Sequence, residues 1–168
     1  MRGINRQAIV SNNYSLIDID RYGVVGSGVH PDYYIAFFWT QLMGTSVLNV
    51  QNPTVNSTGL RVYAHCAESG QGGVSVVAIN INSAKAFSLR TGLAGTFHSF
   101  SITGADGRGV QADAIDVNGR PFAVQPGPSA SMPPLRGKAN GDGEAFVAPP
   151  HSISFLVFEF ARAPACTS

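Results

Sequence analysis

The chain has 168 residues, of which 44% are hydrophobic and only 12% are charged, with 19 Gly, 10 Pro and a formal net charge of +1. A chain of this length can bury one domain core, and this composition favours short strands joined by turns over long solvated helices. Because no run of Lys or Arg supplies the basic surface that phosphate-backbone binding needs, nucleic acid is not expected as a partner.

Targeting and membrane-spanning segments are not predicted. Polar and charged residues interrupt every apolar stretch before it reaches the length of a membrane span. The first residues, MRGINRQ, lack the apolar region of a signal peptide, so any export signal is expected upstream.

The beginning of the chain predicts a strand, a loop and a helix. Residues 6–10 (RQAIV) are typical of a short strand, the polar SNNYS follows, and GVVGSG predicts a glycine-broken loop. Residues 31–43 predict a helix, with Pro31 at its first position, Asp32 favourably placed in its dipole, and Gly44 as its stop. This helix is apolar nearly all round, so we expect it to be packed on two sides.

From Ser46 onward the pattern changes to β-structure. Asn118-Gly119 is a strong signal for a type I′ hairpin, and residues 125–150, rich in Pro and Gly, predict a long irregular loop. The succession of strands predicts an antiparallel β-sandwich. The expected strands are SVLNVQ, LRVYAHC, GVSVVAINI, AFSLR, FHSFSIT, VQADAIDV, RPFAVQ and SISFLVFEF.

No catalytic residue is predicted within the chain. Glycoside hydrolysis needs two positioned carboxyl groups, but most of the 10 carboxylates lie in apparent turns, and Asp113 and Asp116 lie in a probable edge strand. Asp18 and Asp20 are the best remaining pair, yet they fall in a predicted loop without recognisable partners. We therefore expect them to be solvated surface residues.

Metal and cofactor sites are not predicted either. The four histidines, His30, His65, His98 and His151, show no ligand spacing, and the glycine-rich stretches do not follow a strand that leads into a helix. Cys66 and Cys166 lack zinc-site spacing, so buried free thiols are one reading of them. Asn56-Ser57-Thr58 is a glycosylation sequon in a polar turn, and Asn13-Tyr14-Ser15 is a second, formal one.

The order of motifs resembles a known family. RQAIVSNNYSLID is followed by PDYYIAFFWTQLMGTSVL, LRVYAHC, GGVSVVAINI, a DVNGRP hairpin, and finally APPHSISFLVFEF with PAC. Together these resemble the C-terminal part of heparanase and the plant heparanase-like proteins of glycoside hydrolase family 79. The resemblance runs from about Arg6 to Cys166.

The resemblance implies a mainly β fold with two parts. Residues 1–44 would be the eighth strand and helix of an otherwise absent (β/α)8 barrel, and residues 45–168 the C-terminal antiparallel β-sandwich. Such enzymes are retaining endo-β-glucuronidases whose two catalytic glutamates lie on upstream barrel strands. The chain alone is therefore expected to be inactive, with the N-terminal barrel portion and a glucuronate-containing glycan as partners of a full-length form.

The resemblance also implies individual residues. Asn12, Asn13 and Tyr14 match the family's uronate-binding Gly-Asn-Tyr, although Asn12 replaces the glycine and its side chain would hinder approach of a carboxylate to the backbone. Cys66 and Cys166 match a family disulfide, which implies an oxidising compartment. The expected location is extracellular or lysosomal/vacuolar, with peripheral membrane association left open.

Two alternatives come from other classes of protein. One is a stand-alone, non-catalytic carbohydrate-binding or structural β-sandwich, although such a module has no need of residues 1–44. The other is a disulfide-bearing sandwich without sugar function, in which Tyr33, Tyr34, Trp39 and Tyr63 are all core. A barrel-docking domain instead predicts that the helix exposes an apolar face when the chain is alone.

Overall fold

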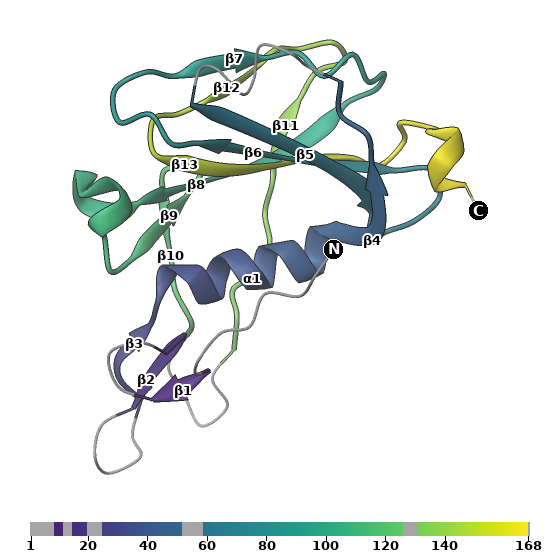
Figure 1. Ribbon diagram of the computed structural model, residues 1–168. Coiled ribbons are helices and arrows are strands. Elements are labelled where there is room, and N and C mark those ends of the chain that lie inside the picture. Colours follow the sequence, from purple (N-terminus) through teal and green to yellow (C-terminus); the bar gives the residue numbers. More distant parts are fainter. Residues whose placement is uncertain (1–8, 12–14, 20–24, 52–58, 126–130, 168) are drawn as a thin grey trace.

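A computed structural model describes residues 9–11, 15–19, 25–51, 59–125 and 131–167. The described residues form a mainly antiparallel β-structure with one long helix (Figure 1). A large sheet lies in the middle, with the helix α1 (Pro31–Leu42) against one face and the small sheet of β7 (Phe87–Leu89) and β12 (Phe146–Ala148) over the other. The expectation of a mainly β, antiparallel fold is confirmed.

The large sheet contains eight of the described strands, in the order β10-β9-β8-β13-β6-β5-β4, with β11 also paired to β8. The edge of β8 that faces away from β13 is shared: β11 pairs with residues 97–99 and β9 with residues 102–104. The strands are β4 (Met43–Leu48), β5 (Leu60–Ala67), β6 (Val74–Asn80), β8 (Phe97–Gly104), β9 (Ile115–Val117), β10 (Arg120–Phe122), β11 (Lys138–Asn140) and β13 (Ser152–Phe158).

The central strands β6 and β13 are buried on both faces, which explains their nearly continuous apolar sequences. Because side chains alternate along a strand, Val77 and Phe155, which are direct cross-strand partners, face the helix. Val76 and Leu156, the neighbouring cross-strand pair of the same two strands, face the small sheet. One sheet therefore separates two hydrophobic cores.

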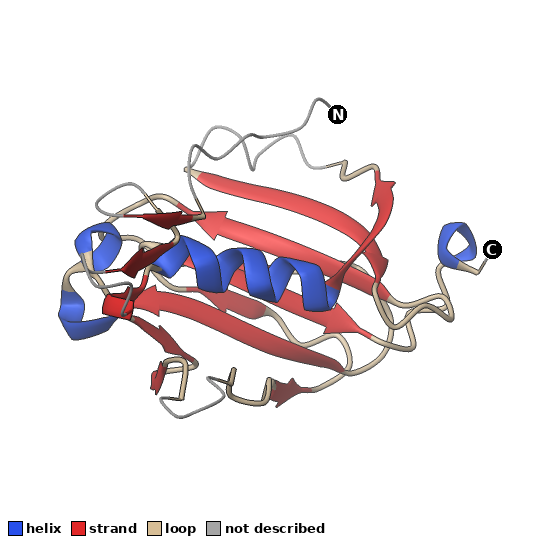
Figure 2. Ribbon diagram, turned by 90° about the horizontal axis from the view of Figure 1, so that it is seen from below, coloured by secondary structure: helices blue, strands red, loops and turns tan. Residues whose placement is uncertain are grey.

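Helix α1 lies across one face of the large sheet (Figure 2). Tyr34 and Phe38 are buried, and the Phe38 ring lies 5.9 Å from that of Phe155. Pro31 begins the helix as predicted. The chain then turns directly into β4, where a Cβ on Gly44 would lie 2.7 Å from the Cys66 carbonyl oxygen, so glycine permits this close approach.

The N-terminal part forms a small sheet of its own. β1 (Val10–Ser11) is parallel to β2 (Ile17–Ile19), which is antiparallel to β3 (Val25–Val29). The structure places this sheet beside the start of α1 (Figure 1). The predicted division between residues 1–44 and 45–168 stays a prediction, since α1 contributes to the same core as the sheet strands.

Several local predictions were wrong. Residues 125–150 contain β11 and β12 rather than only irregular loop, because short strands there pair with distant partners, β8 and β7. GVVGSG contributes β3 instead of a loop, and Asp18 lies on β2. In VQADAIDV only Ile115–Val117 is strand, because Gly109–Gln111 forms a 3-10 turn.

The predicted Asn118-Gly119 hairpin is confirmed. Val117 pairs with Arg120, and both intervening residues have positive φ, 51° and 73°, as a type I′ turn requires. The predicted helix is confirmed as well, ending one residue early at Leu42.

Candidate functional site

The predicted substrate-binding segment, Asn12, Asn13 and Tyr14, lies outside the described residues. The residue that follows it is described. Ser15 is only 1% exposed, and its Oγ lies 2.8 Å from the carbonyl oxygen of Ile17 and 3.0 Å from Oδ1 of Asp18. A hydroxyl has one proton, so it donates to these two acceptors in alternation. Ser15 thus fixes the turn that leads from the segment into β2.

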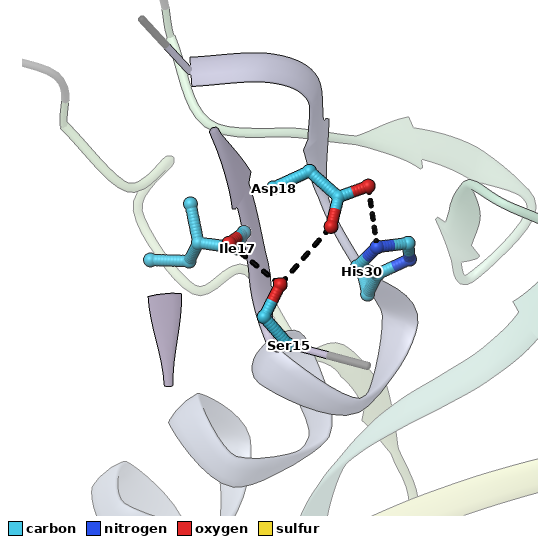
Figure 3. Close-up of polar contacts among 4 residues, drawn as sticks. All are labelled: Ser15, Ile17, Asp18 and His30. Atoms are coloured by element: carbon cyan, nitrogen blue, oxygen red, sulfur yellow. Dashed lines mark hydrogen bonds and ion pairs between the residues drawn. The ribbon is translucent and has the colours of Figure 1, made fainter. Parts of the chain in front are cut away.

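Asp18 links this turn to the start of the helix. Its Oδ2 lies 3.0 Å from Nε2 of His30, the residue immediately before α1, and this contact is an ion pair when the imidazole is protonated (Figure 3). The backbone adds to this link, since the His30 N–H donates to the Leu16 carbonyl at 2.9 Å. The Ser15–Asp18–His30 cluster therefore joins the end of the predicted uronate-binding segment to α1.

This cluster does not have the arrangement of a nucleophilic triad. In a triad the serine hydroxyl bonds to the histidine, and the carboxylate bonds to the other ring nitrogen. Here the contacts run through the carboxylate, which lies between the hydroxyl and the imidazole (Figure 3). The cluster can hold backbone in place, and it offers no activated serine.

Sequence patterns did not predict this cluster. The expectation that Asp18 is a solvated loop residue is wrong, since its side chain is only 17% exposed and contacts His30. Asp20 lies outside the described residues. The contact depends on β2 pairing with β3, which places Ile17 opposite Val29 and so brings Asp18 and His30 together.

Three other carboxylates hold loops in place through an ion pair or a hydrogen bond. Asp113 pairs with Arg108 at 3.0 Å on the surface. Asp142 accepts the backbone N–H of Gly95, and Glu144 that of Gly141, each at 2.7 Å. Within the described ranges, no group of three His, Cys, Asp or Glu side chains is placed to hold a metal ion.

The Cys66–Cys166 disulfide implied by the resemblance is present. It joins β5 to the C-terminal 3-10 turn, Pro164–Cys166. Two backbone hydrogen bonds also hold this end of the chain to the β5–β6 turn: the Gly72 N–H donates to the Cys166 carbonyl, and the Ala163 N–H donates to the Gly72 carbonyl. The free-thiol reading is therefore wrong for this structure. Asn56, the predicted glycosylation site, lies outside the described residues.

Apolar side chains of α1, β4 and β5 are exposed to solvent on the helix side of the large sheet, at its β4–β5 end. Trp39, Val47 and Tyr63 are 37%, 64% and 50% exposed, and we call these three residues the Trp39 face. The Trp39 and His65 rings pack nearly perpendicular to each other, with centroids 5.2 Å apart, and His65 Nδ1 is 2.7 Å from the Gly44 carbonyl oxygen. Val47 pairs with His65, and Tyr63 is two residues before it, so all three lie on the helix side of the sheet.

In the part of the chain that the structure describes, no helix has the length and hydrophobicity to cross a bilayer.

Known proteins place the chain among glycosidase relatives, although no family model matches it. It is 26% identical to heparanase-like protein 2 of Arabidopsis thaliana over 196 residues, which covers 96% of this chain. It is 38% identical to heparanase-like protein 1 over 84 residues, half of the chain. The chain is similar in sequence to the heparanase-like proteins. Baicalin-β-D-glucuronidase of Scutellaria baicalensis is 26% identical and covers 90% of the chain.

These heparanase-like relatives are much longer than the chain. It spans 34% of heparanase-like protein 2 and 27% of baicalin-β-D-glucuronidase, about a third and about a quarter of their lengths. The rest of each relative has no counterpart in this chain.

Solved structures of glycosidases share the fold. An arabinose-bound MgGH51 α-L-arabinofuranosidase matches 85% of the chain, and 21% of its own, with a TM-score of 0.52 at 18% identity. The α-L-arabinofuranosidase of Thermotoga maritima matches 88% of the chain, and 32% of its own, with a TM-score of 0.51 at 14% identity. At these identities the likeness concerns the fold alone.

Proposed function

We propose that the chain is the C-terminal region of a heparanase-like, retaining endo-β-glucuronidase, and that it is non-catalytic by itself. The observation that carries this proposal is the match of 96% of the chain to 34% of heparanase-like protein 2. In this proposal residues 1–44 are the eighth strand and helix of a (β/α)8 barrel, and residues 45–168 are the β-sandwich. The catalytic glutamates belong to the barrel portion.

The Trp39 face is the surface on which the barrel portion would dock. Apolar side chains on a monomer surface gain free energy when a partner removes them from water, about 25 cal/mol per Å². Trp39 and Tyr63 are also of the types most often found at the energetic centres of interfaces. Helix α1 would then be packed on two sides, by the sheet through Phe38 and by the barrel through Trp39.

The Ser15–Asp18–His30 cluster would position the uronate-binding segment. Asn12, Asn13 and Tyr14 lie between β1 and Ser15, at the end of the proposed barrel strand, where active-site loops of such barrels gather. Fixing Ser15 and the start of α1 restricts the segment at its C-terminal end. Less conformational freedom is then lost when a glucuronate-containing glycan binds.

The disulfide supports an oxidising location for this protein. Structural disulfides persist in secreted and lumenal compartments and are rare in the cytosol. We therefore propose an extracellular or lysosomal/vacuolar protein, glycosylated at Asn56, with peripheral membrane association as a further part of the proposal.

A stand-alone carbohydrate-binding or structural module is the second candidate. It is favoured by the two hydrophobic cores, which are well buried within the described residues themselves, with Phe38, Phe155 and Leu156 at 0% exposure. This candidate predicts no affinity for a barrel portion.

The test measures hydrolysis and docking. The purified chain is assayed with 4-nitrophenyl β-D-glucuronide, and its binding to the separately produced remainder of heparanase-like protein 2 is measured by calorimetry. We expect no hydrolysis by the chain alone and a measurable complex. A Trp39→Ala/Tyr63→Thr variant should bind more weakly, whereas the matched control Val147→Thr/Phe160→Ala, which changes exposed apolar residues elsewhere, should not.

The contrary outcomes separate the candidates. Hydrolysis by the chain alone would place the catalytic residues within it and overturn the proposal. Absence of a complex would favour the stand-alone module. Equal weakening in both variants would show that the Trp39 face is not the docking surface.

A further inference from the structure

A cavity of about 570 Å³ opens at the β9–β10 end of the large sheet, the opposite end from the Trp39 face. Two arginines line it, Arg120 and Arg136. Lys138 borders it as well, but Lys138 pairs with Ser99, on the face of β8 that carries Phe97, so its side chain is directed to the small-sheet side. The apolar wall of the cavity includes Phe122, Pro133 and Pro134. Ligand pockets typically measure roughly 300–1,000 Å³ and are mainly apolar with a few polar groups, and this cavity fits that description.

Two segments distant in sequence build the cavity. Arg120 pairs with Val117 across the hairpin and so faces the helix side, whereas Asp116 pairs with Pro121 on the other face. Arg136 and Lys138 come from the segment that enters β11. Gly137 between them lies so close to the sheet that a Cβ there would meet His98 at 2.7 Å and Phe100 at 2.9 Å.

The positive charge of this cavity is unbalanced. No acidic residue lines it, and in the described ranges neither arginine side chain has a hydrogen-bond or ion-pair partner. Some cations elsewhere do have partners: Arg108 pairs with Asp113, and Arg90 donates to the Gly143 carbonyl. Lys85 makes a cation–π contact, 5.1 Å from the centre of the Phe87 ring.

Unpaired like charges gathered at one site repel one another, and a bound anion would relieve this repulsion. Arginine in particular pairs with planar or tetrahedral anions through two parallel hydrogen bonds. The neighbouring prolines and Phe122 offer a surface against which a flat apolar ring can lie. The positive charge and the apolar wall together indicate a ligand with two parts, an anionic group and an apolar ring.

We propose that this cavity binds a small anion that carries an apolar ring, with its carboxylate, sulfate or phosphate group held by Arg120 and Arg136. The ring lies against Phe122 and the prolines. This site is separate from the proposed uronate-binding segment and from the Trp39 face, and it needs no other part of a longer protein.

The experiment titrates the full 168-residue chain with phenyl phosphate, phenyl sulfate and benzoate by NMR or calorimetry. Inorganic sulfate tests the charge without the ring, and benzyl alcohol tests the ring without the charge. We expect at least one ring-bearing anion to bind more tightly than inorganic sulfate and benzyl alcohol. Its binding should weaken as salt is added, since exposed charges are screened. The ring-bearing anion that binds most tightly, phosphate, sulfate or carboxylate, identifies the anionic group that the site prefers.

Arg120→Gln/Arg136→Gln should weaken that binding by about tenfold, equivalent to about 1.4 kcal/mol. Arg162→Gln is the matched control, because Arg162 is an exposed arginine that does not line the cavity, and it should leave binding unchanged. Circular dichroism verifies that each variant is folded. Lack of binding by every ring-bearing anion, equal binding of inorganic sulfate or benzyl alcohol, or equal loss in the control variant would overturn the proposal.

Discussion

The Asn118 side chain fills the gap that two strands leave along β8, where its Oδ1 accepts the backbone N–H of Ser101 at 2.9 Å. Its Nδ2 donates to the Ser99 carbonyl, also at 2.9 Å, and its own backbone N–H donates to the Ser101 carbonyl at 2.8 Å. β11 ends its pairing at Ser99 and β9 begins at Ile102. One turn residue therefore satisfies the backbone groups that neither strand reaches.

Replacing Asn118 should destabilise the fold for two separable reasons. Asn118→Ala removes both side-chain hydrogen bonds, each worth about 1 kcal/mol, and places alanine at φ 51°, which costs roughly 1–2 kcal/mol more. We expect a loss of about 3 kcal/mol in the free energy of unfolding, measured by urea denaturation. Glycine adopts a positive φ without strain, so Asn118→Gly should lose only the part of the unfolding free energy that comes from the two side-chain hydrogen bonds. Equal losses in the two variants would contradict this account.

Gly44→Ala should destabilise the junction between α1 and β4. The new Cβ would lie 2.7 Å from the Cys66 carbonyl oxygen, and crowding of this kind typically costs about 1–3 kcal/mol. Gly141→Ala is the control, since its nearest neighbour within 4 Å is a Glu144 carboxylate oxygen at 3.6 Å. Thermal unfolding should show a lower Tm for Gly44→Ala alone. An unchanged Tm would mean that the junction relaxes without cost.

Removing the disulfide should lower stability through the unfolded state. Cys66 and Cys166 are separated by 100 residues, and closing a loop of that length restricts the unfolded chain by roughly 4.7 kcal/mol in the entropy model, with about 2–4 kcal/mol usually measured. Cys66→Ser/Cys166→Ser should therefore unfold at lower denaturant concentration than the oxidised protein. Dithiothreitol should bring the unchanged protein to the same midpoint and have no effect on the double variant. If reduction leaves the midpoint of the unchanged protein where it was, the disulfide does not stabilise the fold.

Asp18 and His30 should be energetically coupled. A double-mutant cycle with Asp18→Asn and His30→Gln isolates the pair, whose side chains are 17% and 32% exposed. Because the pair is partly buried, we expect a coupling of about 1 kcal/mol, at the upper end for exposed ion pairs. Strictly additive losses in unfolding free energy would show that the contact contributes nothing.

Local patterns predicted the elements whose cause is local. The helix from Pro31 and the Asn118-Gly119 hairpin depend on neighbouring residues, so their signals lie within a few positions. β11 and β12 were missed because three-residue strands in a Pro- and Gly-rich stretch carry almost no periodicity. They form only because β8 and β7 offer edges to pair with. The Ser15–Asp18–His30 cluster was missed for the same reason.

The sequence by itself determined the β-rich class, the helix, the Asn118-Gly119 hairpin and the similarity to the heparanase-like proteins, because these follow from composition, short-range pattern and ordered motifs. Only the tertiary structure decided which charges meet. Arg120 and Arg136 are 16 positions apart and show no charge run in the sequence, yet they line one cavity because β9, which carries the hairpin, and β11 pair with the same edge of β8. Strand pairing brings distant residues together by backbone hydrogen bonds, which every residue except proline can form, so side-chain pattern alone does not specify the partner.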